Sequence, residues 1–377
     1  MADPDRFFHR PKGKHHGCRR CHGFSEQPQP ASERSRDLPE GNRHRGIGGA
    51  ARVQLDLGLE HHFTNYAMCP NPLQFLTYMA GKTKTIKLGT AALILPWHKD
   101  PLRIATDIAM LDNLSNGRVI VGLGRGLGRV EYDGFGIAMD SSRDRFNEAA
   151  PMILNALETG YMDAYDGEYF KQIRVALRPA PFRTFKDRTY IVSMSPDTVP
   201  HAARLGGTMM TFAVGPWKQR AKDIKLYREL FEKQHDRPAP PTSANIFTIC
   251  DKDPGRARDM AHKYMGDYWE SAMQHYEMKG EHFDNIKGYE HYGRSAVAMR
   301  ENADRVTEQY VEQQIYGTPD QCLEKLKGIE DIVGPLELNC FFTYAGMDYD
   351  YVKTGMTLFA EKALPALKKW QYTGNAA

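Results

Sequence analysis

The fold is decided by residues 86–127, which read IKLGTAALILPWHKDPLRIATDIAMLDNLSNGRVIVGLGRGL. The stretch begins with an aliphatic run, 86–95, that ends at Pro96 and has the length and composition of a buried strand. Residues 101–114 follow, with apolar side chains at 104, 105, 108, 109, 111 and 114, which is the spacing of one helix face. A second aliphatic run, 119–123, comes next. A buried strand, a helix and another buried strand in this order predict a parallel β-α-β unit.

The same alternation of apolar runs and amphipathic stretches continues towards the C-terminus. We predict further strands at 190–193, 208–212, 245–250 and 336–342. We predict further helices at 143–157, 198–205, 219–233, 319–329 and 351–367. About seven such units over about 320 residues favour an α/β protein with a (β/α)8 TIM barrel over an open sheet. The active site of such a barrel lies at the C-terminal ends of its strands, so the residues that follow each strand are the candidates for function.

The composition is that of a globular protein. The chain has 377 residues, 41% hydrophobic, and 50 Lys and Arg against 47 Asp and Glu give a net charge of +3. This balance does not favour a nucleic-acid binder. No apolar stretch is long enough to cross a membrane and none resembles a signal peptide, so we expect a cytoplasmic protein. The six cysteines, at 18, 21, 69, 250, 322 and 340, are consistent with reduced thiols.

Residues 1–50 differ from the rest of the chain. They contain few large apolar side chains and show no helical or strand periodicity, so we expect a disordered basic segment ahead of a barrel at 51–377. A zinc site at Cys18-x-x-Cys21 is a weaker alternative, because a structural zinc site usually has a second ligand pair and only His44 follows at a suitable distance.

The sequence Glu60-His61-His62-Phe63 follows the apolar run 55–59 and therefore falls at the C-terminal end of a predicted strand. A histidine beside a carboxylate provides a general base and its orienting partner, and we predict His61 and Glu60 as catalytic residues. A surface loop is the alternative. We predict no metal here, because neighbouring side chains of a strand point to opposite faces and the two histidines should not chelate one ion.

Two more strand ends carry residues suited to a phosphate. Gly124-Arg125-Gly126 follows 119–123, where glycine lets a ligand approach the backbone and arginine offers a planar fork. Ser195 and Thr198 stand where a helix begins, and they can cap that helix or bind an anion at its positive end. Taken alone, a tight turn would explain Gly124-Arg125-Gly126, and a helix cap would explain Ser195 and Thr198. Their place on neighbouring strand ends favours a phosphate pocket.

These motifs together resemble the bacterial luciferase-like flavin monooxygenases. The matching stretches are EHHFTNYAMCPNP (60–72), KLGTAALILP (87–96), DIAMLDNLSNGR (107–118), GLGRGL (122–127), SMSPDTVPHAA (193–203) and LELNCFFTYAGM (336–347). The resemblance implies a TIM barrel that binds reduced FMN, supplied by a separate reductase. It also implies a dimer that uses O2 through a flavin 4a-hydroperoxide to oxidise a small organic substrate, with an aldehyde as one candidate.

The resemblance also implies roles for single residues. His61 matches the family's catalytic histidine, and Arg125, Ser195 and Thr198 match contacts to the flavin phosphate. Ala91 and Ala92 match a pair joined by a cis peptide bond beneath the flavin ring. Gly124 and Gly126, on either side of the arginine, complete the predicted cofactor site.

Three residues depart from the family pattern. Gly124 stands in place of a reactive cysteine, Met194 in place of a glutamate and Gly128 in place of a tyrosine. Loss of the cysteine argues against light emission more than against oxygenation. Residues 254–316 lie where the family has a mobile lid. Their aromatic side chains suit either a cover that excludes water or ordinary helix packing.

The family's first barrel strand and helix have no counterpart in residues 1–50, which read like a translation in another frame. We therefore expect a barrel that lacks this first unit and has an open edge. Two other functions stay open on the sequence: an oxidoreductase that uses the deazaflavin F420, and a barrel that binds flavin without catalysis.

Overall fold

The structure is a computed structural model that describes residues 55–370. The predicted disorder of residues 1–50, and the question of whether they are a frame error or a genuine extension, lie outside the described residues. No helix in the described part is both long enough and apolar enough to span a membrane.

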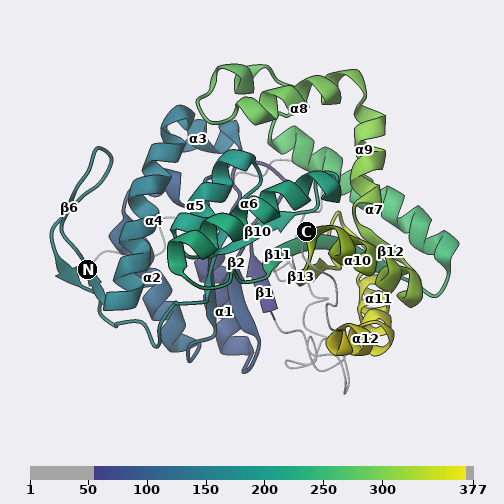
Figure 1. The fold of residues 1–377 in the computed structure, drawn as a ribbon, viewed down its shortest axis with the longest axis horizontal. Coiled ribbons are helices and arrows are strands. Elements are labelled where there is room, and N and C mark those ends of the chain that lie inside the picture. The colour runs from purple at the N-terminus through teal and green to yellow at the C-terminus, as the bar shows by residue number, and fades with distance from the viewer. Residues whose placement is uncertain (1–54, 371–377) are drawn as a thin grey trace, which may run out of the picture.

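A parallel sheet forms the centre of the molecule (Figure 1). Its strands follow one another in the order β1 (Leu55–Gly58), β2 (Lys87–Thr90), β4 (Val119–Gly124), β9 (Thr189–Val192), β10 (Thr208–Phe212) and β11 (Thr242–Cys250). The short β3 (Leu93–Ile94) pairs with β4, and β12 (Ile315–Gly317) and β13 (Leu336–Phe341) both pair with β11. Every residue of β4 and β11 is buried, so both faces of these two strands are covered. β4 is apolar throughout, whereas β11 also contains four buried polar residues, Thr242, Ser243, Asn245 and Thr248.

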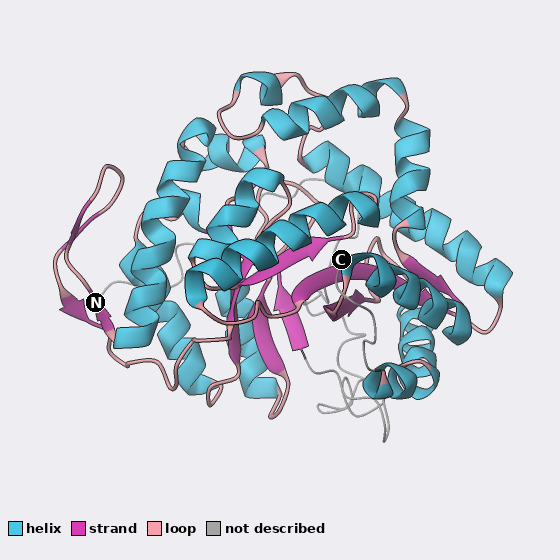
Figure 2. Ribbon diagram, viewed as in Figure 1, coloured by secondary structure: helices cyan, strands magenta, loops and turns pink. Residues whose placement is uncertain are grey.

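Helices surround this sheet, as Figure 2 shows. They are α1 (Pro72–Lys82), α2 (Pro101–Leu114), α3 (Arg129–Phe135), α4 (Ser142–Thr159), α5 (Val199–Arg204), α6 (Trp217–His235), α7 (Pro254–His275), α8 (Glu290–Glu301), α9 (Ala303–Glu312), α10 (Pro319–Val333), α11 (Tyr349–Lys362) and α12 (Leu364–Lys369). Short 3-10 turns lie at η2 (Leu95–Trp97), η3 (Met139–Ser141), η4 (Pro196–Thr198) and η5 (His282–Asn285). The side chains of Asn71 and Asp100 cap α1 and α2, and a proline follows each cap.

Two local features differ from the predicted elements. The strand predicted at 86–95 is divided into β2 and β3, and the peptide bond between Ala91 and Ala92 is cis, as the family resemblance implied. Two small antiparallel pairs that the sequence did not predict follow α4, namely β5 (Tyr161–Met162) with β8 (Val175–Ala176) and β6 (Tyr165–Asp166) with β7 (Lys171–Gln172). These pairs are two residues long, too short for a recognisable period.

Close approach of the backbone fixes the middle of the sheet. A Cβ on Gly122 would lie 2.0 Å from the carbonyl oxygen of Thr90 on the neighbouring strand, so this position admits only glycine. The Thr90 hydroxyl donates to the Gly122 carbonyl at 2.8 Å and accepts from the Gly122 amide at 2.9 Å. β2 and β4 are thereby joined at the level where the candidate site begins.

The sheet does not close in the described part of the chain. There β1 pairs with β2 alone, and β12 and β13 each pair with β11 alone. All six residues of β13 are partly exposed, in contrast to the buried β11 beside it. The predicted α/β class with a parallel sheet is confirmed, whereas closure into a full barrel is not shown.

The segment 254–316 is mainly helical. It contains α7, η5, α8 and α9, and ends in β12. Figure 1 shows α8 and α9 at the top of the molecule as drawn, above α7.

Candidate active site

A cavity of about 560 Å³ lies at the C-terminal ends of the central strands. Its lining comes from residues that follow β1, β4, β9 and β10, and from α7, α8 and α9. Every predicted site residue except Ser195 lines it: Glu60, His61, Ala91, Ala92, Gly124, Arg125, Gly126 and Thr198. The fold therefore gathers these residues from separate strand ends into one chamber.

The buried carboxylate of Glu131, which was not predicted from the sequence, contacts the ring of His61. Oε1 of Glu131, on α3, lies 3.2 Å from Nδ1 of His61 and accepts a hydrogen bond from the backbone amide of His62 at 2.8 Å. Burial alone would raise the pKa of Glu131. Interactions with His275 and His61 outweigh this effect and lower its pKa to about 2. Glu131 is therefore an ionised acceptor at neutral pH.

A second histidine faces the other oxygen of this carboxylate. Nε2 of His275, at the end of α7, lies 3.4 Å from Oε2 of Glu131, and its Nδ1 lies 2.7 Å from the Thr64 hydroxyl. Burial is the main reason that the pKa of His275 is lowered. Donor atoms of His61, Glu131 and His275 lie within 4.8 Å of one another, a set that could also hold a metal ion. His61 and Glu131 are joined at 3.2 Å, whereas Nε2 of His275 and Oε2 of Glu131 face each other at 3.4 Å and complete no hydrogen bond in the described part of the chain.

Gly128 makes room for Glu131 and His275. A Cβ at Gly128 would lie 2.5 Å from Oε2 of Glu131 and 3.1 Å from Nε2 of His275. Two buried side chains, those of Glu131 and His275, therefore occupy the space that a side chain at position 128 would enter. Gly128 and Glu131 are three residues apart in the sequence, but only the fold places His275 opposite the Glu131 carboxylate.

The predicted partnership of Glu60 with His61 is wrong. Glu60 accepts hydrogen bonds from the indole of Trp97 at 2.8 Å and the amide of Ile94 at 2.8 Å, and its Oε1 lies 3.3 Å from Nε2 of His62. Side chains two residues apart on extended chain share a face, so the carboxylate meets the second histidine and not the first. Burial would raise the pKa of Glu60, but bonds from His62 and His98 lower it to about 2.

The other end of the cavity carries positive charge. The Arg125 guanidinium donates to the Gly288 carbonyl at 2.8 Å and lies 3.8 Å from the centre of the Tyr289 ring. Arg143, at the start of α4, is a second arginine, not predicted from the sequence, that lies near Arg125 without itself lining the cavity. Its pKa is lowered to about 10 by burial and by the charge of Arg125.

Two further observations mark this end as a place for an anion. Burial, followed by the charges of Arg143, Arg204 and Arg125, lowers the pKa of His201 to about 4. Nη2 of Arg143 and Oγ of Ser195 are buried and have no hydrogen-bond partner among the described residues. Buried polar groups are normally satisfied, so these donors fit a ligand that supplies acceptor oxygens, as a phosphate does.

Between the two ends the cavity is apolar. Ala91 and Ala92 are buried, and a Cβ at Gly124 would lie 3.3 Å from the Ala92 Cβ and 2.8 Å from Cδ1 of Ile94. Aromatic side chains line the same chamber: Tyr66, Trp97, Phe247, Tyr268, Trp269, Tyr276 and Tyr310. Small and aromatic side chains around one space suit a flat ring system.

Comparison with known proteins agrees with this arrangement. The family model for luciferase-like monooxygenases matches residues 57–334. An alkanal monooxygenase alpha chain from Photorhabdus luminescens is 28% identical over 318 residues, which cover 83% of this chain and 87% of that protein.

Two solved structures share the fold. The oxygenating constituent of 3,6-diketocamphane monooxygenase from Pseudomonas putida, in complex with FMN, has a TM-score of 0.68 at 16% identity and covers 92% of this chain and 98% of that one. The coenzyme F420 dependent tetrahydromethanopterin reductase from Methanopyrus kandleri has a TM-score of 0.60 at 18% identity and covers 84% and 91%. Because the family model matches most of its length, the chain belongs to the luciferase-like monooxygenases, a family of flavin-dependent oxidoreductases.

Proposed function

We propose that this protein is the oxygenating component of a two-component monooxygenase, which receives reduced FMN from a separate reductase and oxidises a small organic molecule with O2. The observation that carries the proposal is the pair of buried, unpartnered donors, Arg143 Nη2 and Ser195 Oγ, in a region made positive by Arg125. Reduced FMN, when bound, supplies the electrons that activate O2.

The phosphate end of the site is suited to the flavin tail. Arg125 and Arg143 offer guanidinium groups, and Ser195 and Thr198 offer hydroxyl groups at the start of the next helix. Ala91, Ala92 and Gly124 leave room for a flat ring, with the aromatic side chains of the cavity around it. The residues present therefore fit the cofactor.

His61 acts as the base in this proposal. Because Glu131 is ionised, it can only accept, so the proton of a neutral His61 stands on Nδ1 and Nε2 is the basic atom. Nε2 lies 3.4 Å from the hydroxyl of Tyr276, and His61 lines the cavity. His61 takes a proton at Nε2 and returns it there, while Glu131 holds the ring in place.

The helices α7, α8 and α9 form a lid in this proposal. Tyr268 and Trp269 of α7 and Tyr310 of α9 are buried against the cavity, and the indole of Trp269 stacks on the Tyr310 ring at 4.3 Å. Closing such a wall excludes water from the reacting atoms. The proposal includes the arrangement that the family resemblance implies, a (β/α)8 barrel that forms a dimer.

Oxygen uptake by the protein with photoreduced FMN tests the function. We expect consumption of O2 and oxygenated product with one member of a panel of aldehydes, ketones and terpenes. Parallel titrations with reduced FMN and reduced F420 test the cofactor. Tight binding of F420 without O2 consumption would overturn the monooxygenase assignment, and binding of neither would favour a barrel without this catalysis.

A further inference from the structure

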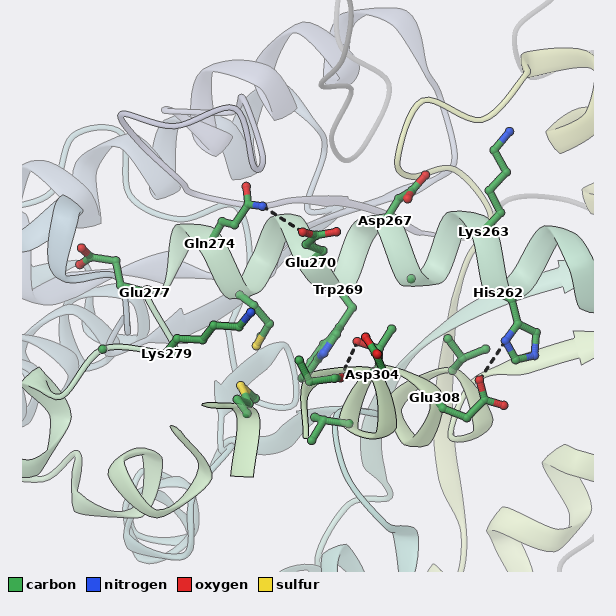
Figure 3. A pocket seen from close by; sticks show the side chains of 18 residues that line it. His262, Lys263, Asp267, Trp269, Glu270, Gln274, Glu277, Lys279, Asp304 and Glu308 are labelled. Carbon is green, nitrogen blue, oxygen red and sulfur yellow. Dashed lines mark hydrogen bonds and ion pairs between the residues drawn. The ribbon is translucent and has the colours of Figure 1, made fainter. Parts of the chain in front are cut away.

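A second cavity, of about 690 Å³, lies between α7 and α9 (Figure 3). Its lining comes from α7, the turn that follows it, the end of α8, and α9. The two long walls approach each other at Gly266, where a Cβ would lie 3.7 Å from Cγ2 of Thr307. This outer cavity is separate from the candidate active site and has no part in the function proposed above.

The outer cavity and the inner chamber share a wall that is one layer of side chains thick. Trp269, Met273, Met299 and Val306 line both spaces. Trp269 is held by its stacking on Tyr310. The two methionines are unbranched and flexible, so they can change rotamer without moving a helix. A passage between the cavities would therefore open between Met273 and Met299.

The outer cavity has an acidic rim. Its charged residues are Asp267, Glu270, Glu277, Asp304 and Glu308 against Lys263, Lys279 and the titratable His262. Figure 3 shows these side chains on α7, on α9 and in the turn that follows α7. Exposed Asp267, Glu270 and Asp304 carry the negative charge of this rim, whereas Glu277 binds Arg129 and Glu308 lies 3.1 Å from His262. The far end of the inner chamber carries the positive charge of Arg125, whereas the charge of Arg220, which also lines it, is paired with Asp223 at 2.8 Å.

We propose that the organic substrate enters through the outer cavity and passes between Met273 and Met299 into the inner chamber. The acidic rim admits apolar molecules that carry no negative charge and repels anions such as the flavin phosphate. The flavin uses the arginine end instead, so the two reactants do not compete for one entrance. This inference rests on the proposed function for the identity of the inner chamber.

Three eight-carbon probes test the charge selection without turnover. Association of 1-octanol, octylamine and octanoate with the protein is followed by stopped-flow tryptophan fluorescence at low salt. We expect octanoate to associate about fivefold or more slowly than 1-octanol, and octylamine at least as fast as 1-octanol, because the carboxylates at the rim repel an anion and attract a cation. Equal association rates for octanoate and 1-octanol would overturn the charge selection. Exchange of Glu270→Gln and Asp304→Asn together should remove most of this difference, whereas Asp259→Asn, an exposed change on α7 outside both cavities, should not.

A larger side chain in the proposed passage between the two cavities tests the route. Stopped-flow tryptophan fluorescence gives the association rate of 1-octanol with the protein and with Met273→Phe, alongside Met260→Phe as the same change on α7 outside both cavities. We expect about a tenfold slower association of 1-octanol in Met273→Phe alone. Equal rates in the two variants, or no binding of 1-octanol at all, would overturn the route. The association rates of 1-octanol are measured without flavin. If the protein did not bind FMN, the proposed function would be refuted, but these rates would still test the entrance.

Discussion

At the scale of single residues, the neighbouring histidines His61 and His62 have different partners. His61 faces the cavity and Glu131, whereas His62 bonds through its ring to Glu60. We expect His61→Ala to lose about 10²–10⁴-fold in turnover, the usual cost of a lost general base, and to keep its affinity for reduced FMN. His62→Ala is the matched control and should lose less. Oxygen-uptake and product assays on both variants check the assignment, which fails if the control is the more damaged enzyme.

The buried carboxylates make stability depend on pH in a defined direction. Glu60 and Glu131 have folded pKa values of about 2, below the ordinary value of 4.5, so the stability they provide is complete above 4.5 and is lost as pH falls towards 2. Each contributes about 3 kcal/mol to the free energy of unfolding at neutral pH. Urea unfolding between pH 6 and 2.5 should show this loss. The Glu60→Gln protein should have a lower free energy of unfolding at pH 6 and should lose less of it as pH falls to 2.5. Parallel curves of unfolding free energy against pH for the two proteins would contradict the assignment.

The arginines at the anion end can be tested through the phosphate alone. Arg143→Ala should weaken FMN binding by about 1.5–3 kcal/mol, the range for a hydrogen bond to a charged group. Riboflavin lacks the phosphate and should bind equally to both proteins. Arg145→Ala, on the same helix with its guanidinium over Tyr169, provides the control. An equal loss for riboflavin and FMN would mean that Arg143 acts on the fold instead.

At the scale of elements, strand ends could be predicted from the sequence and side-chain partnerships could not. β10 has the predicted bounds, β4 extends one residue further, and the positions after them line the cavity. Aliphatic runs that end at glycine or proline carry this information locally. His61, Glu131 and His275 come from three elements far apart in the chain, so only the tertiary fold can bring them together. The short pairs β5 to β8 were missed for a different reason, the lack of any period in two-residue strands.

The start of α8 is attached to the strand ends by one tyrosine. The Tyr289 hydroxyl donates to the Gly126 carbonyl at 2.9 Å and lies 3.1 Å from the Ser142 hydroxyl, and its ring lies against Arg125. Tyr289→Phe keeps the ring and removes the hydroxyl. We expect the free energy of unfolding to fall by about 1 kcal/mol and proteolysis between α7 and α9 to become faster. Tyr264→Phe on α7 should change neither, and an unaltered cleavage rate in Tyr289→Phe would contradict the attachment.

At the scale of the whole molecule, the parallel sheet followed from composition and alternation, but its closure did not. β1 and β13 each have a single neighbour in the described part of the chain, and β13 is partly exposed along its length. Such an edge is where a further strand of a barrel would pair. The expectation that the first strand and helix of a barrel are missing rests on residues 1–50, which lie outside the described residues, so it stays a prediction.

The composition of the first fifty residues leads to a prediction about truncation. They lack the apolar pattern that packing needs, so a chain that begins at Val53 should unfold with the same free energy as the full chain. Denaturant unfolding of both chains, with FMN titrations alongside, makes the comparison. A loss of more than about 1 kcal/mol, a typical effect of a whole mutation, would show that the segment packs against the sheet.

The space at Gly128 has a consequence for what this position tolerates. A Cβ there would lie 2.5 Å from Oε2 of Glu131 and 3.1 Å from Nε2 of His275, so a larger residue has to displace the ends of these two side chains. The Glu131 carboxylate is the far end of a flexible side chain and can move aside, so a substitution at 128 would act on the contact between Glu131 and His61 before it acts on the fold.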